Sequence, residues 1–236
     1  MISHRFKCIY IHISKCAGST IEKSFGIDIA DISQENNKNL FGWNEKHKIF
    51  LQHATPFELL DKGFLNSKIW ESYYKFIIVR NPWERALSDY IWLSNEQNIQ
   101  DKFENFILGK GVFSKCMKDS NSKLYRGDHL TSQVNYFFLN KHKIKYDRII
   151  RFENLREGLS EVKNDLGLPD SFFSEKINVG EKRFSHYSKF YDNRRKDLVY
   201  NTYYKDAKFL NYYFEDYRTI FDFANFIRSS KYLIQR

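Results

Sequence analysis

The chain has 236 residues, of which 42% are hydrophobic and 18% aromatic, enough to form the core of one large domain. Its net charge of +9 indicates a surface that attracts anions, without choosing between nucleotides, acidic glycans, nucleic acid and anionic lipid. No apolar run approaches the roughly 20 residues that span a bilayer. The three cysteines lack metal-ligand spacing, which favours a reducing compartment. We expect a cytoplasmic protein, although a Golgi-lumenal chain without its N-terminal anchor would have the same sequence.

Strands and helices are expected to alternate along the chain. Short β-branched and aromatic runs predict strands at 8–13, 49–53, 75–80 and 146–152. Capping residues and helical spacing predict helices at 21–25, 57–62, 82–95, 103–108, 130–139, 153–167 and 193–234. The segment 28–48 is expected to be irregular. This order predicts a three-layer α/β fold with a central parallel sheet flanked by helices and a helical C-terminal part, in a single domain spanning 1–236.

A loop of small residues follows the first predicted strand and leads into a helix. Ala17 and Gly18 allow close approach of the backbone to a ligand, Ser19 and Thr20 offer hydroxyl donors, and Lys15 adds a mobile positive charge. Such a loop can hold a phosphate or a sulfate. Its spacing alone leaves a structural turn and an anion site equally open.

The loop differs from a Walker A loop, because Lys15 precedes Gly18 instead of following a glycine. No aspartate that could hold Mg²⁺ is evident at the end of a later strand. Magnesium-dependent hydrolysis of a nucleoside triphosphate is therefore disfavoured, and no metal site is predicted.

A second strand-loop-helix segment places Arg80 at the end of the strand 75–80. Ligands bind at this edge of open α/β sheets. Ser88 follows about two helical turns later, in the helix that Asn81 and Pro82 introduce. Arg80 could instead pair with a carboxylate for structural reasons.

These two segments together, His12–Thr20 and Val79–Tyr90, resemble the sulfotransferases that use 3′-phosphoadenosine 5′-phosphosulfate (PAPS). The likeness is greatest to the Golgi-type carbohydrate sulfotransferases of the heparan and chondroitin type and to their bacterial relatives. It continues through Gln52-His53-Ala54, Gln133 and Arg151–Leu155, and it spans about 6–217, with 218–236 as an extension. The resemblance implies a P-loop-NTPase-like version of the α/β fold and a protein of bacterial origin.

The resemblance also implies which residues contact PAPS and its product, 3′-phosphoadenosine 5′-phosphate (PAP). The loop would hold the 5′-phosphosulfate, Arg80 and Ser88 the 3′-phosphate, and a lid segment the adenine. The residues implied are Lys15, Cys16, Ala17, Gly18, Ser19 and Thr20 in the loop, then Arg80 and Ser88, and Arg183 and Ser185 in the lid. Cys16 stands where the family commonly has threonine, so a weaker donor replaces the hydroxyl.

Catalysis is expected to rest on Lys15 and His53. Lys15 would neutralise the leaving phosphate oxygen, and His53 would take the proton of the acceptor hydroxyl. His53 is expected to end the second strand, at the sheet edge shared with Lys15 and Arg80, and it matches the base of related carbohydrate enzymes. His129 and His186 remain candidates for acceptor or nucleotide contacts.

The expected function is sulfuryl transfer to a hydroxyl of a carbohydrate or of another hydroxyl-bearing acceptor, with no nucleic-acid partner. A small-molecule kinase would share the sheet and loop but require Mg²⁺ and ATP. A non-catalytic binder of polyanions would lose affinity steeply with salt. The extension 218–236 is expected to serve core or dimer packing, with peripheral membrane contact as the alternative. The oligomeric state stays open.

Overall fold

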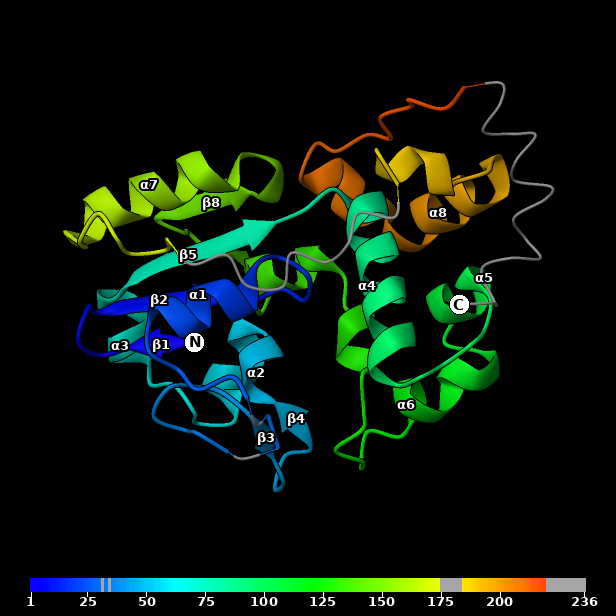
Figure 1. Ribbon diagram of the computed structural model, residues 1–236. Helices are drawn as coiled ribbons and strands as arrows, with labels where there is room; N and C mark the ends of the chain where they lie inside the picture. The colour runs from blue at the N-terminus through cyan, green and yellow to red at the C-terminus, as the bar shows by residue number, and fades with distance from the viewer. Residues whose placement is uncertain (31, 34, 175–183, 220–236) are drawn as a thin grey trace. The chain divides into compact units, whose positions relative to one another are not determined.

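The computed structural model describes residues 1–30, 32–33, 35–174 and 184–219 (Figure 1). The chain divides into two compact units, the first made of 1–80 with 119–179 and the second of 81–118 with 180–236. The single-domain organisation stays a prediction. Most of the extension 218–236, and with it the predicted packing or membrane role, lies outside the described residues.

A four-stranded sheet forms the centre of the first unit, in the order β1 (Ile2–Ser3), β2 (Cys8–Ile11), β5 (Tyr74–Val79), β8 (Arg148–Arg151). β2, β5 and β8 are parallel, and β1 pairs antiparallel with β2. All of β2 and all of β5 except its first residue are buried. Both faces of these strands are therefore covered, as expected for a parallel sheet between layers. β8 is an edge strand, and its Ile149 is 52% exposed.

Four helices accompany the sheet in this unit: α1 (Gly18–Ser24), α2 (Pro56–Asp61), α3 (Ser67–Ser72) and α7 (Leu155–Leu166). Thr55 begins α2 through a capping box with Glu58, as its sequence position predicted. Gly167 ends α7 with a φ of 59°, a conformation that favours glycine. Figure 1 shows α7 lying along β8. The predicted α/β class, with parallel strands flanked by helices, is confirmed.

The predicted strand 49–53 is wrong in its extent and in its sheet. Only β4 (Ile49–Phe50) is extended, and it pairs with β3 (Trp43–Asn44) in a separate two-stranded sheet. The following 3₁₀ helix η1 (Leu51–His53) turns away because the Gln52 side chain accepts a hydrogen bond from the Gly42 N–H at 2.9 Å. A side-chain contact across ten residues therefore helps to fix the segment that carries His53.

The predicted helix 130–139 is also wrong. The segment contains the last residue of the 3₁₀ helix η3 (Gly127–Leu130), the whole 3₁₀ helix η4 (Gln133–Phe137) and β6 (Phe138–Leu139), which forms a hairpin with the later β7 (His142–Lys143). A further backbone hydrogen bond, from the Ile144 N–H to the Phe137 carbonyl, joins the two sides of this hairpin. A further 3₁₀ helix, η5 (Phe152–Asn154), joins β8 to α7.

Among the described residues of the second unit, every regular element is a helix. These are α4 (Pro82–Glu96), α5 (Phe103–Ile107), η2 (Gly111–Phe113), α6 (Ser114–Lys118), η6 (Tyr187–Phe190) and α8 (Asn193–Phe209). Asn81 caps α4 by accepting a hydrogen bond from the Trp83 N–H. Buried aromatic rings fill the core: Phe103, Phe106, Phe113, Phe190 and Tyr191. The predicted helix 193–234 ends at Phe209, and 210–219 is not helical. Within the described residues, no helix is both long and apolar enough to cross a membrane.

A buried ion pair joins the end of β2 to α1. His12 Nδ1 and Glu22 Oε1 lie 2.8 Å apart, and both side chains are less than 10% exposed. Burial alone would raise the pKa of the Glu22 carboxyl, but the charge of His12 and the hydrogen bond with its ring outweigh burial and lower that pKa from its ordinary value of 4.5. Glu22 therefore stabilises the fold in its ionised form.

Replacing this carboxylate should make stability less dependent on acid pH. A folded-state pKa below the unfolded value gives stability that is present above the unfolded pKa and lost as the pH falls through the folded one. Glu22→Gln should lower the free energy of unfolding by about 1–3 kcal/mol near neutral pH. The difference from the wild type should shrink below about pH 4.5. Urea denaturation near neutral pH and below about pH 4.5 measures the free energy of unfolding of both proteins, with exposed Glu71→Gln as the control. A difference that grows at low pH would contradict the prediction.

Gly158 should be required where α7 meets β8. A Cβ added there would lie 2.4 Å from Cγ2 of Ile150. Gly158→Ala should therefore lower the free energy of unfolding by about 1–3 kcal/mol, although alanine favours helices. Exposed Ser160→Ala in the same helix should change it by less than about 0.5 kcal/mol. Thermal or urea denaturation measures the stability of both variants. Equal stability of Gly158→Ala and Ser160→Ala would contradict the close packing of α7 against β8.

Candidate active site

The loop between β2 and α1 has an unusual backbone. Lys15 and Ala17 adopt left-handed conformations, with φ of 62° and 64°, although neither is glycine. Each costs about 1–2 kcal/mol, and such conformations cluster at functional sites. The Tyr10 hydroxyl holds the loop by donating to the Cys16 carbonyl at 2.8 Å. Alternating left-handed residues beside a helix start turn successive N–H groups toward one point, which is how backbone cradles bind anions.

Residues of this loop differ in exposure. Lys15, Ala17, Ser19 and Thr20 are half-buried, whereas Gly18 is buried. Cys16 is also fully buried, so its thiol does not lie at the surface of the loop. The groups that the loop offers to a ligand are therefore backbone N–H groups, two hydroxyls and the Lys15 ammonium.

Arg80 is held against this loop within the same unit. Its Nη1 donates to the Lys15 carbonyl at 2.9 Å, and its guanidinium lies 4.0 Å from the centre of the Phe152 ring. The buried side chain of Gln133 grips its backbone, because Oε1 accepts from the Arg80 N–H at 3.0 Å and Nε2 donates to its carbonyl at 2.8 Å. The strand end and the loop thus bring two cationic side chains to one edge of the sheet.

His53 approaches the loop through one intervening ring. A Cβ added to Gly18 would fall 1.7 Å from Nε2 of His12, so the His12 ring occupies the space above this glycine. The His53 ring meets the His12 ring edge-on, with centres 4.7 Å apart. The Tyr136 hydroxyl donates to the His53 carbonyl at 2.9 Å. His53 was predicted at the end of a strand, and the structure puts it at the end of η1 instead.

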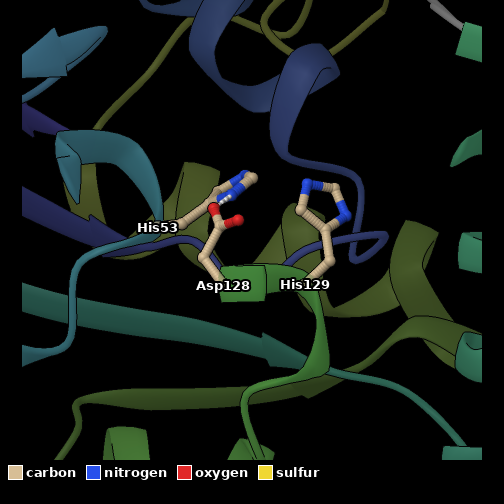
Figure 2. A group of neighbouring side chains, drawn as sticks. All are labelled: His53, Asp128 and His129. Atoms are coloured by element: carbon tan, nitrogen blue, oxygen red, sulfur yellow. Dashed lines mark hydrogen bonds and ion pairs between the residues drawn. The ribbon is translucent and has the colours of Figure 1, made fainter. Parts of the chain in front are cut away.

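Asp128 and His129, from η3, complete a cluster around His53 (Figure 2). His53 Nδ1 and Asp128 Oδ2 are 2.6 Å apart, and the rings of His53 and His129 are 4.9 Å apart. Burial alone would raise the pKa of the Asp128 carboxyl, but His129, the hydrogen bond with His53 and the charges of His53 and Arg126 lower it. Asp128 is therefore an ionised acceptor of the His53 ring proton.

Nitrogen and oxygen atoms of His53, Asp128 and His129 lie within 4.8 Å of one another. Such atoms are also of the type that transition metals take. However, His53 Nδ1 and Asp128 Oδ2 already bond to each other at 2.6 Å. A metal bound by both of these atoms would have to displace this hydrogen bond.

Other predicted site residues belong to the second unit. Ser88 is half-buried on α4, and Ser185 is exposed just before η6. Arg183 lies outside the described residues. His186, a candidate ligand contact, has its Nδ1 2.9 Å from the Ser188 hydroxyl.

Sequence reasoning did not single out Asp128 or Glu22. Asp128 lies outside the predicted strands and helices, 75 residues from His53. No local pattern marks Asp128, because its partner His53 lies in a distant part of the sequence.

Comparison with known proteins gives three findings. A family model described as the sulfotransferase family matches residues 1–217. An uncharacterized protein of Archaeoglobus fulgidus is 24% identical over 107 residues, which is 45% of this chain and 78% of that protein. A crystal structure of a sulfotransferase from Alicyclobacillus acidocaldarius aligns over 90% of this chain and 98% of its own, with 14% identity and a TM-score of 0.44, a likeness too distant to transfer function.

The family model covers nearly the whole described chain, including the loop, Arg80 and His53. The chain therefore belongs to the sulfotransferase family.

Proposed function

We propose that this sulfotransferase takes the sulfuryl group from PAPS and transfers it to a hydroxyl of a carbohydrate, with His53 as the general base. Family membership supports sulfuryl transfer, and the donor, the acceptor class and the base are the proposal. The observation that supports this proposal is that His53 lies close to the loop 15–20. His53 is one ring removed from Gly18, because the His12 ring lies against both residues.

The donor would bind through its two anionic ends. The loop offers backbone N–H groups, the hydroxyls of Ser19 and Thr20 and the Lys15 ammonium to the 5′-phosphosulfate. Arg80, held by Phe152 and by the Lys15 carbonyl, is the proposed contact of the 3′-phosphate. The further contacts of Ser88, Ser185 and Arg183, and of the Cys16 backbone, rest on the family resemblance. No metal is needed in this scheme.

The reaction would be a single in-line displacement. The acceptor oxygen forms a bond to sulfur as the bond between sulfur and the 5′-phosphate oxygen breaks, and PAP leaves. The acceptor proton moves to Nε2 of His53, while Lys15 neutralises the charge that develops on the leaving oxygen. Positioning and electrostatics account for the rate, as in phosphoryl transfer.

A carbohydrate acceptor is proposed on two grounds. The histidine base matches the one in related carbohydrate enzymes, and a net charge of +9 draws acidic polysaccharides toward the protein. The positively charged surface would raise the rate of encounter with such chains at low salt.

Binding of PAP should require Arg80. Calorimetric titration without metal should show that Arg80→Ala weakens binding by about 10- to 100-fold, the effect of losing charged hydrogen bonds to a phosphate. Exposed Arg156→Ala, which removes the same charge from α7, should leave affinity unchanged. Equal affinity for ATP and PAP would favour a kinase instead. Binding that survives Arg80→Ala and falls steeply with salt would indicate a polyanion binder.

Turnover should depend on Lys15 and His53. Transfer of labelled sulfate from PAPS to unsulfated heparin-type and chondroitin-type chains measures it. Lys15→Ala should reduce kcat by about 10²–10³-fold through lost charge stabilisation. His53→Ala should reduce it by about 10²–10⁴-fold through the lost base. Exposed Lys68→Ala on α3 serves as the control. Full activity of either variant would remove that residue from the mechanism.

A further inference from the structure

We propose that Asp128 is a positioning residue, which keeps the proton of neutral His53 on Nδ1 so that Nε2 is free to accept the proton of the substrate hydroxyl. Asp128 would also stabilise the imidazolium that forms when Nε2 takes this proton. The inference rests on the proposed role of His53 as base, and it adds a residue that neither the sequence pattern nor the family resemblance singled out.

The hydrogen bond between the two side chains determines the tautomer. An ionised carboxylate can only accept, so the 2.6 Å contact between Asp128 Oδ2 and His53 Nδ1 requires the proton to be on Nδ1. In the neutral ring, Nε2 then carries the lone pair. With the opposite tautomer, Nε2 would carry the proton and could not act as a base.

Asp128 makes this contact at an energetic cost. Its Oδ1 is buried and has no hydrogen-bond partner among the residues that the structure describes. An unsatisfied buried acceptor lowers the stability of the fold and calls for an explanation. The described hydrogen bond of this side chain is the one to His53 (Figure 2). The carboxylate therefore serves His53 more than it serves the packing of η3.

Several titratable groups of both signs surround His53. His12 faces it from the end of β2, with Glu22 of α1 behind. Asp128 and His129 face it from η3. Arg126, just before η3, acts on Asp128. Two carboxylates thus oppose Arg126 and whichever histidines are protonated, so removal of Asp128 makes the charge beside the base more positive by one unit.

The His12–Glu22 pair has the same chemistry but cannot have the same role. Nε2 of His12 lies where a Cβ on Gly18 would fall, so the backbone of the loop covers the atom that would have to accept a proton. The two pairs therefore divide their tasks: Glu22 fixes a structural ring, and Asp128 orients a reactive one.

The first test reads the tautomer directly and needs no acceptor. Multiple-bond ¹H–¹⁵N spectra of the full chain labelled with ¹⁵N-histidine are recorded at about pH 8, and His53→Gln assigns the signals. His53 should be the Nδ1–H tautomer in the wild type and should lose this preference in Asp128→Asn. A wild-type His53 protonated on Nε2 would overturn the proposal.

The second test reads turnover and PAP binding together. Asp128→Asn should lower kcat by about 10- to 100-fold, as when a partner that orients a histidine is lost. Its affinity for PAP should stay within about twofold of the wild type, since Asp128 contacts neither phosphate in the proposal. Asp128→Glu should restore part of kcat. Fully exposed Asp170→Asn should behave as the wild type.

The pH profile separates positioning from a structural role. Without the carboxylate the imidazolium is less stable, so the acid limb of kcat should move to lower pH in Asp128→Asn. A structural defect would lower the amount of active protein without moving this limb. An unmoved limb, or wild-type activity that chelators abolish and Zn²⁺ restores, would overturn the proposal. A wild type that neither binds PAP nor transfers sulfate would refute the proposed function, while the tautomer would still decide the Asp128–His53 pair.

Discussion

The contact between the His12 ring and the backbone of Gly18 is the constraint on which the site depends. A side chain at position 18 would place its Cβ 1.7 Å from Nε2 of His12, so only glycine permits this approach. The contact brings the end of β2 against the start of α1, and the loop between them folds with left-handed Lys15 and Ala17. The His12 ring also meets the His53 ring edge-on. The close approach that Gly18 permits therefore sets the position of the candidate base, His53, relative to the loop.

Two histidine–carboxylate pairs then give this region its electrostatic character. Both carboxylates, Glu22 and Asp128, are held ionised in surroundings that would otherwise favour their neutral forms, because histidines lie beside them. Similar environments produce different consequences. The Glu22 pair holds the His12 ring against the loop, whereas the Asp128 pair holds the His53 ring beside His129. The proposed sulfuryl transfer needs both a rigid cradle and an oriented base, and the pairs would supply one each.

Elements with strong local signals were predicted well. The strands 8–13 and 75–80 overlap β2 and β5, and Thr55 caps α2 as expected. Hydrophobic runs and caps act through neighbouring residues, so the sequence displays them. The strand predicted at 49–53 failed because Gln52 bonds to the Gly42 backbone, a contact that no periodic pattern reveals. The helix predicted at 130–139 failed where hairpin pairing overrode helical spacing.

By itself, the sequence determined the α/β class, the loop of small residues after the first predicted strand, the strand end carrying Arg80, and the motifs that mark the sulfotransferase family. These features follow from composition, periodicity and motifs that are contiguous in the chain. Only the tertiary structure decided the partners of the reactive groups. Asp128 reaches His53 across 75 residues, and Gln133 grips Arg80 across 53. Such pairings depend on how distant segments pack, and a linear pattern carries no record of that packing.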